Sequence, residues 1–116
     1  MSEDLPVLNA WSDFLDWFFD TLDRFPKKVR FTLTTRLLNL SLDVLEDLID
    51  AKYTSKQEKV LLLNAANRKI EKLRVLSRLC LKKQIFQPRD YERMAKELQF
   101  AGAQVGGWLK EAKQKI

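Results

Sequence analysis

Basic side chains crowd one stretch of the sequence, and their spacing is its strongest chemical signal. Residues 51–86 carry ten bases and two acids, a net charge of +8 in a chain whose total is +5. Cations along one long helix can follow a phosphate backbone and gain affinity by counterion release, without reading bases. At about 100° per residue, one arc of such a helix collects Arg68, Lys72, Arg74, Arg78, Lys82 and Lys83.

The basic stretch also contains Lys69, and a second group of bases precedes it, namely Lys27, Lys28, Arg30 and Arg36. We expect this second group to extend the same surface. An asymmetric charge distribution of this kind favours a polyanion or an acidic protein surface as the partner. The alternative is a solvated helix face, which most runs of charge turn out to be.

Carboxylates also repeat at helical spacing, as in the ridge formed by Asp43, Glu46, Asp47 and Asp50. Carboxylate-bridged metal sites in helical bundles add Glu-x-x-His motifs from facing helices, and the sequence contains no histidine. We therefore interpret the acidic ridges as solvated faces or as partners of a basic neighbour, and expect neither a metal nor a cofactor.

The usual catalytic sets are missing from the sequence. Without histidine there is no Ser-His-Asp triad, no Cys-His pair and no HExxH zinc motif. Cys80 is the single cysteine, so it forms no internal disulfide or CxxC knuckle, and the three glycines form no phosphate-binding loop. These absences favour a protein that is not an enzyme.

The elements that position the charged residues are all predicted to be helices. Three glycines and three prolines in 116 residues leave few turns, and each segment between them has apolar residues at a helical period. Ser55 followed by Glu58 is a capping box, while Pro26 and Pro88 mark helix starts. We predict a single all-α domain over residues 1–116, an antiparallel up-down-up-down four-helix bundle with helices at about 8–25, 26–52, 55–83 and 88–113.

Some apolar residues exceed what one bundle core requires. The segment 26–52 has a second apolar row that includes Leu38, Leu42 and Leu45, and Trp17 and Phe19 lie off the main stripe of the first helix. We interpret these five residues as oligomer or partner contacts. Small residues around Gly102, Gly106 and Gly107 predict close approach of another helix, with local fraying before a C-terminal turn as the alternative.

No targeting or membrane segment is evident. The N-terminal residues lack the basic-then-apolar pattern of a signal peptide, and the uncharged apolar runs are far shorter than the roughly 18 residues of a membrane span. Membrane insertion of the aromatic first helix is disfavoured because its neighbours are aspartates. We expect a reduced, cytoplasmic protein.

The order of several short segments resembles a known four-helix-bundle family. These segments are residues 25–33 (FPKKVRFTL) followed by Arg36, residues 61–67 (LLLNAAN) followed by 70–74 (IEKLR), and residues 106–109 (GGWL). The family includes the accessory variability determinant (Avd) of diversity-generating retroelements and the proteins encoded in 23S rRNA intervening sequences. The acidic, aromatic first helix departs from the family pattern.

The resemblance implies a barrel-like homopentamer with a basic surface. Its partners would be the retroelement reverse transcriptase and template RNA, and also DNA, bound largely without sequence specificity. The protein would support mutagenic copying of that RNA without being the enzyme, and the matching positions Arg68, Lys69, Lys72, Arg74 and Arg78 would face nucleic acid or polymerase. Two alternatives stay open: an interaction scaffold whose basic face docks an acidic protein, and an rRNA-insert-type bundle of unknown role.

Overall fold

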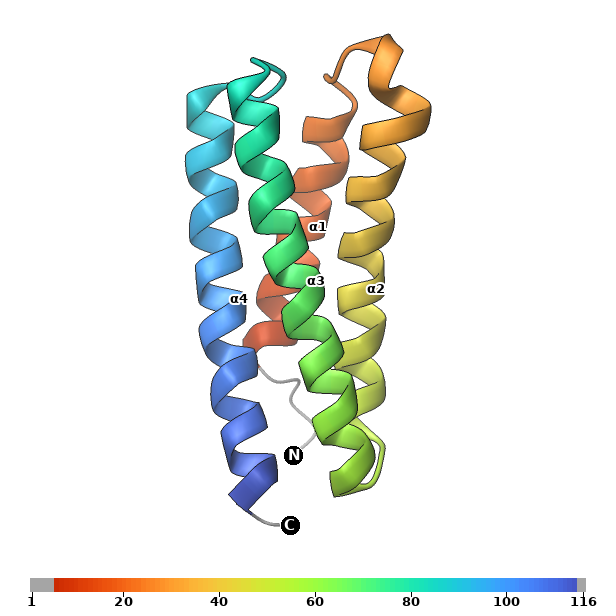
Figure 1. The fold of residues 1–116 in the computed structure, drawn as a ribbon, viewed down its shortest axis with the longest axis vertical. Helices are drawn as coiled ribbons and strands as arrows, with labels where there is room; N and C mark the ends of the chain where they lie inside the picture. Colours follow the sequence, from red (N-terminus) through yellow and green to blue (C-terminus); the bar gives the residue numbers. More distant parts are fainter. Residues whose placement is uncertain (1–5, 115–116) are drawn as a thin grey trace.

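The regular structure of the chain is helical throughout the part described here, residues 6–114 of a computed structural model. The four long helices are α1 (Pro6–Leu22), α2 (Thr35–Lys52), α3 (Lys56–Lys82) and α4 (Pro88–Gln114). Figure 1 shows the α1–α2 and α3–α4 connections at one end of the bundle and the α2–α3 connection at the other, so that successive helices run in opposite directions. The prediction of an all-helical, four-helix fold is confirmed.

One apolar seam runs along the centre of the bundle, which measures 46 × 24 × 23 Å. The aromatic residues of α1 fill its middle: Phe14 packs against Trp11 and Phe18 with ring centroids 4.7 and 5.0 Å away. The Trp11 Nε1 donates a hydrogen bond of 2.8 Å to the carbonyl oxygen of Ser41 on α2. This bond satisfies the polar atom of a buried indole and fixes the register of α1 against α2.

The first helix is shorter than the sequence predicted, ending at Leu22 instead of Phe25. Phe25 is nevertheless buried, because it turns inward from the connection and meets the Phe86 ring edge-on, with centroids 5.5 Å apart and an interplanar angle of 88°. The helical spacing of Phe25 was therefore a guide to burial but not to secondary structure. The two phenylalanines close the end of the core between the two connections.

The second helix also differs from the prediction that it starts at Pro26. Pro26 is extended, with φ −57° and ψ 144°, and precedes a 3-10 turn (Lys27–Val29) and a π-helical turn (Arg30–Thr34). The Thr35 hydroxyl donates to the carbonyl oxygen of Arg30 at 3.0 Å, which occupies a backbone acceptor of the wide turn. Threonine hydroxyls compete in this way with regular helical bonding, so that α2 itself begins only at Thr35.

The ends of α3 are set by local hydrogen bonds. The Ser55 side chain accepts a bond of 3.2 Å from the backbone N–H of Glu58, which confirms the predicted N-terminal cap. At the other end Gln84 has a φ of 63°, and the backbone N–H groups of Gln84 and Ile85 bond to the carbonyls of Leu81 and Cys80. This is a Schellman ending with glutamine at the position that glycine usually occupies.

The glycines of α4 do not mark a close helix approach, as the sequence had suggested. The helix continues past them to Gln114, and a Cβ built on Gly106 or Gly107 would meet nothing within 4 Å. A Cβ on Gly102 would lie 3.6 Å from Nη2 of Arg74, which is ordinary contact. Neither the predicted close packing nor the alternative of fraying is found here.

Replacing Gly107 by alanine is therefore expected to stabilise the protein. The new methyl group has open space, and alanine loses less backbone entropy than glycine in a helix. We expect the free energy of unfolding to rise by about 0.5–1 kcal/mol, measured by urea denaturation. A decrease would show that another surface approaches this glycine in solution.

Cys80 belongs to the core, and burial raises the pKa of its thiol to about 11. An unfolded thiol ionises near pH 8.5, so the unfolded state releases its proton first as the pH rises. The Cys80 contribution to stability is therefore complete below pH 8.5 and is lost as the pH approaches 11.

The expected result is a decline in the free energy of unfolding of about 2–3 kcal/mol between pH 8.5 and 11 that Cys80→Ala removes. The free energy of unfolding of both proteins is measured by denaturation across this pH range. All other titratable groups are the same in the two proteins, so the difference between the curves reports Cys80. Parallel curves for the two proteins would contradict the explanation.

Candidate nucleic-acid interface

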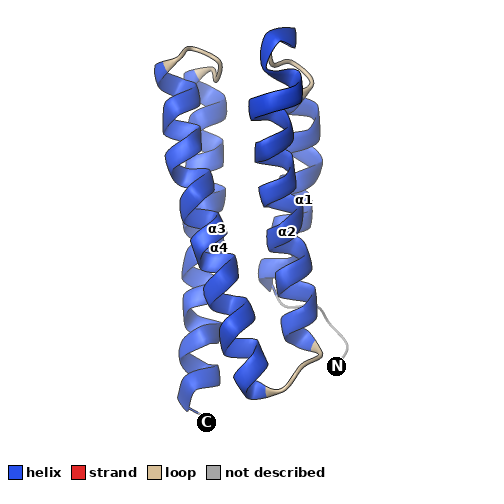
Figure 2. Cartoon of the chain, turned by 45° about the vertical axis from the view of Figure 1, so that its right-hand side comes forward, coloured by secondary structure: helices blue, strands red, loops and turns tan. Residues whose placement is uncertain are grey.

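Charge is segregated between the helices. The helix α1 carries three aspartates and no base, whereas α3 carries eight bases and two acids. The α2 and α4 helices each pack against both α1 and α3, so the two helices of opposite charge lie diagonally across the all-helical bundle (Figure 2). One flank of the bundle is consequently acidic and another is basic.

The fold gathers further bases at one end of the bundle. The α1–α2 and α3–α4 connections lie together there, although α2 and α3 separate them in the sequence (Figure 1). We call this region the basic end and define it by seven exposed residues: Arg24, Lys27, Lys28, Arg30, Lys82, Lys83 and Arg89. The acids of the same two connections are the exposed Asp23 and the buried Asp90.

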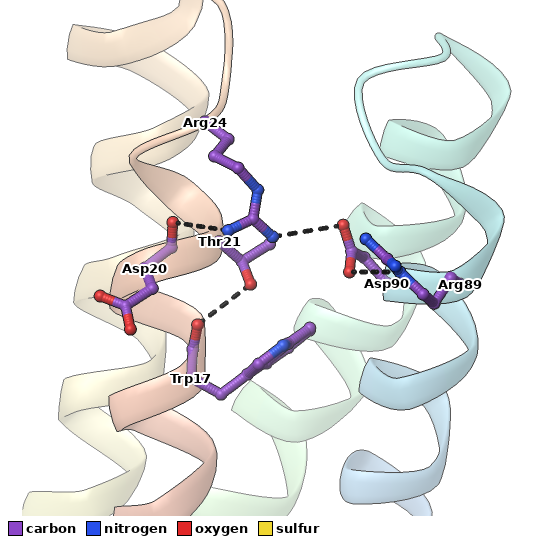
Figure 3. A network of polar contacts seen from close by, with 6 residues as sticks. All are labelled: Trp17, Asp20, Thr21, Arg24, Arg89 and Asp90. Atoms are coloured by element: carbon purple, nitrogen blue, oxygen red, sulfur yellow. Dashed lines mark hydrogen bonds and ion pairs between the residues drawn. The ribbon is translucent and has the colours of Figure 1, made fainter.

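A network of polar contacts ties α1 to α4 beside the basic end (Figure 3). The Asp90 carboxylate is almost fully buried and lies 3.6 Å from Nη2 of Arg24 and 3.9 Å from Nε of Arg89. Arg24 also donates from Nη1 to the carbonyl oxygen of Asp20, and the Thr21 hydroxyl donates to that of Trp17. Arg24 thus bridges the end of α1 and the Asp90 carboxylate, whose place in the first turn of α4 suits the helix dipole.

Trp17 lies next to this network and is partly buried against the core. Its ring packs on Phe14 and Phe18, and the Arg93 guanidinium lies over it at 4.9 Å from the centroid. Sequence reasoning missed the part played by Arg24, Arg89 and Arg93. Periodicity could not reveal Arg24 and Arg93, because their partners Asp90 and Trp17 lie on a helix distant in the sequence.

The predicted bases on α3 have different surroundings. Arg68, Lys72, Arg78, Lys82 and Lys83 are exposed. By contrast, Lys69 makes an ion pair with Asp47 of α2, and both side chains are largely buried.

Arg74 is also engaged, because Nη1 lies 2.7 Å from the Glu71 carboxylate while Nη2 approaches Gly102 of α4. Within residues 6–114 the predicted bases are thus divided into exposed cations without an ion pair and cations paired with a carboxylate of α2 or of α3 itself.

The four bases of the second segment, which were predicted to extend this surface, are all exposed but divide by position. Lys27, Lys28 and Arg30 belong to the basic end, while Arg36 lies further along and lines a groove between α2 and α3 with Lys72. The structure thus joins the first three bases to Lys82 and Lys83 of α3, and separates Arg36 from them.

Exposed apolar side chains lie among the α3 bases, which sequence reasoning did not anticipate. Leu61, Val75 and Leu79 are on the outer side of the helix, and Phe31 in the π-helical turn of the second segment is 87% exposed. The spacing of Val75 and Leu79, outside the core stripe, was the available signal. A mixed apolar and basic surface is more typical of a protein contact than of phosphate binding alone.

The predicted oligomer contacts are unequal in exposure. Phe19 is 47% exposed, whereas Leu38, Leu42 and Leu45 are partly buried against the core. Trp17 is partly buried beneath Arg93. Of the five residues, Phe19 thus offers the largest free apolar surface.

Two further features bear on function. Within residues 6–114 no three histidine, cysteine or acidic side chains come together as a metal site would require. The same residues include no helix long and apolar enough to span a membrane.

Comparison with known proteins identifies one family. Residues 7–112 match the model of the family described as bAvd-like, which covers all four helices almost completely. A search of curated proteins found no match.

The division of the α3 bases leads to a stability prediction. Lys69→Met leaves the largely buried Asp47 carboxylate without its partner, and is expected to lower the free energy of unfolding by about 1–2 kcal/mol. Arg78→Met removes an exposed cation of the same helix and is expected to change the free energy of unfolding by less than about 0.5 kcal/mol. Thermal or urea denaturation of both variants tests this, and equal losses would contradict the assignment.

Proposed function

The chain belongs to the bAvd-like family, and on that premise we propose that it is a non-catalytic accessory protein of a diversity-generating retroelement. It binds template RNA and the reverse transcriptase, and supports mutagenic copying of that RNA into cDNA. It acts in the cytoplasm as a homo-oligomer, with the pentamer that the family resemblance implies. The finer parts of this proposal rest on the surface chemistry described above.

The observation that carries RNA binding is the basic end. Seven exposed bases from two connections share one end of a bundle about 24 Å wide, so several can meet neighbouring phosphates of a single strand. Release of condensed counterions from those phosphates supplies a favourable free energy that does not depend on base sequence. The Asp90 carboxylate keeps Arg24 and Arg89 at this end of the bundle, and both arginine side chains remain more than half exposed.

A second candidate function is supported by the apolar residues beside these bases. Phe31 and Leu79 add exposed apolar surface near the basic end, which suits an acidic protein partner better than a phosphate backbone. In the proposed accessory role that partner is the reverse transcriptase. In the alternative role, that of an interaction scaffold, an acidic protein is the main ligand and RNA binds weakly.

Binding of a labelled, unrelated single-stranded RNA, titrated across salt concentrations, tests the proposal. Steep salt dependence is expected, with a logarithmic slope of about −0.7 for each phosphate contacted. Lys82→Glu/Lys83→Glu is expected to weaken binding at least tenfold at low salt and to flatten the slope by about 1.4, since two contacts are lost.

The matched control is Lys110→Glu/Lys113→Glu, which makes the same change in net charge at the opposite end of the bundle. It is expected to have a smaller effect, and helicity measured by circular dichroism should be retained in both variants. Equal losses would show that net charge rather than the basic end governs binding. Absence of binding by the wild-type protein at low salt would favour the scaffold.

A further inference from the structure

A groove between α2 and α3 has an apolar floor and a basic rim. Leu40, Val75 and Leu76 line it together with three charged residues, Arg36, Glu71 and Lys72, and its volume is about 380 Å³. The Glu71 carboxylate is engaged by Arg74 at 2.7 Å. Within residues 6–114 Arg36 and Lys72 have no such ion pair, and both are exposed. The groove therefore suits an apolar group accompanied by carboxylates.

The same chain presents that combination on α1. Phe19 is 47% exposed, and the nearby Asp16, Asp20 and Asp23 all lie on the solvent side of the chain. None of the three aspartate carboxylates forms an ion pair within the described residues, and α1 carries no base to neutralise them. A contact that buries Phe19 and pairs these aspartates with cations would remove the exposed apolar surface and satisfy the unpaired carboxylates together.

We propose that the groove between α2 and α3 of one copy receives the Phe19 side of α1 from a second copy. Phe19 lies against Val75 and Leu76, while Asp16 and Asp20 pair with Arg36 and Lys72. The inference rests on the self-assembly included in the proposed function, and it specifies which surfaces meet. It does not depend on RNA binding.

The heights of the two surfaces along the bundle agree with this contact. The bond from Trp11 to Ser41 sets these residues about level on α1 and α2. Because the two helices run in opposite directions, Asp16, five residues beyond Trp11, is about level with Arg36, five residues before Ser41. Copies placed side by side with parallel long axes therefore bring the acidic group of one to the basic group of the next without a vertical shift.

The contact uses a different surface on each partner, so it is heterologous. Repetition of a heterologous contact without a shift along the axis generates a closed ring if the rotation per copy closes. The contact also assigns Arg36 and Lys72 to assembly. The basic end, which lies beyond the groove, stays available for RNA.

The contact is tested by reversing the charges on one or both surfaces. The mass of each variant in solution is measured by light scattering. Arg36→Glu/Lys72→Glu places carboxylates opposite carboxylates, and Asp16→Lys/Asp20→Lys places cations opposite cations. Each double variant is expected to lose the oligomer at a protein concentration where the wild type retains it. The chain carrying all four substitutions restores opposite charges at every contact and is expected to recover the wild-type mass.

A milder pair of variants controls for misfolding. Phe19→Ala removes the apolar group at the contact, and Phe100→Ala removes a phenylalanine of similar exposure, 42%, on α4. Phe19→Ala is expected to raise the concentration at which the oligomer dissociates at least tenfold, with Phe100→Ala unchanged and helicity retained in both.

The outcomes separate the two levels of the argument. A monomeric wild-type protein would defeat the proposed self-assembly and this inference together, leaving the groove to an acidic helix of another protein. An oligomeric wild type whose double variants keep the wild-type mass would overturn the inference alone. Equal dissociation concentrations for Phe19→Ala and Phe100→Ala would also overturn the inference alone. RNA binding is measured independently of both results.

Discussion

Burial of the aromatic stripe of α1 is the constraint on which the rest of the molecule depends. Trp11, Phe14 and Phe18 lie on one face of α1, and a single helix cannot bury its own apolar face. These side chains leave water only if α2 and α4 pack on either side of α1. The short connections then make successive helices antiparallel. This arrangement brings residues 23–34 and 83–87 to the same end, where Phe25 and Phe86 seal the core.

The functional surfaces follow from that arrangement. Neither connection is strongly basic over a long stretch, but their juxtaposition produces the basic end. The nearly buried Asp90 carboxylate contacts Arg24 and Arg89 there, and so links the α1–α2 connection to α4. The helix α1 carries acids without bases and α3 carries mostly bases, so the bundle has flanks of opposite charge.

Much of the fold was predictable from the sequence, and the limits have physical causes. Helical periodicity gave the four helices, and Ser55 with Glu58 located the start of α3, because these signals are local. Burial of Phe25 was predicted correctly but its helical state was not, since an apolar residue can reach the core from a turn. The π-helical turn depends on threonine side chains bonding to the backbone, which periodicity does not register.

The candidate site was predictable only in part. The bases of α3 were found by spacing, but Lys69 and Asp47 pair across two helices, and this pairing requires the relative rotation of α2 and α3. The same rotation places Arg36 beside Lys72 at the groove instead of with Lys27 and Lys28. Long-range packing, rather than residue type, decides which cation is free.

The most direct test of the central claim is lysine footprinting, in which lysines are acetylated in the presence and absence of single-stranded RNA and the modified sites are read by mass spectrometry. If the basic end binds RNA, RNA should reduce acetylation of Lys27, Lys28, Lys82 and Lys83 and leave the reactivity of Lys110 and Lys113 unchanged. Protection spread evenly over all these lysines, or confined to Lys110 and Lys113, would contradict it.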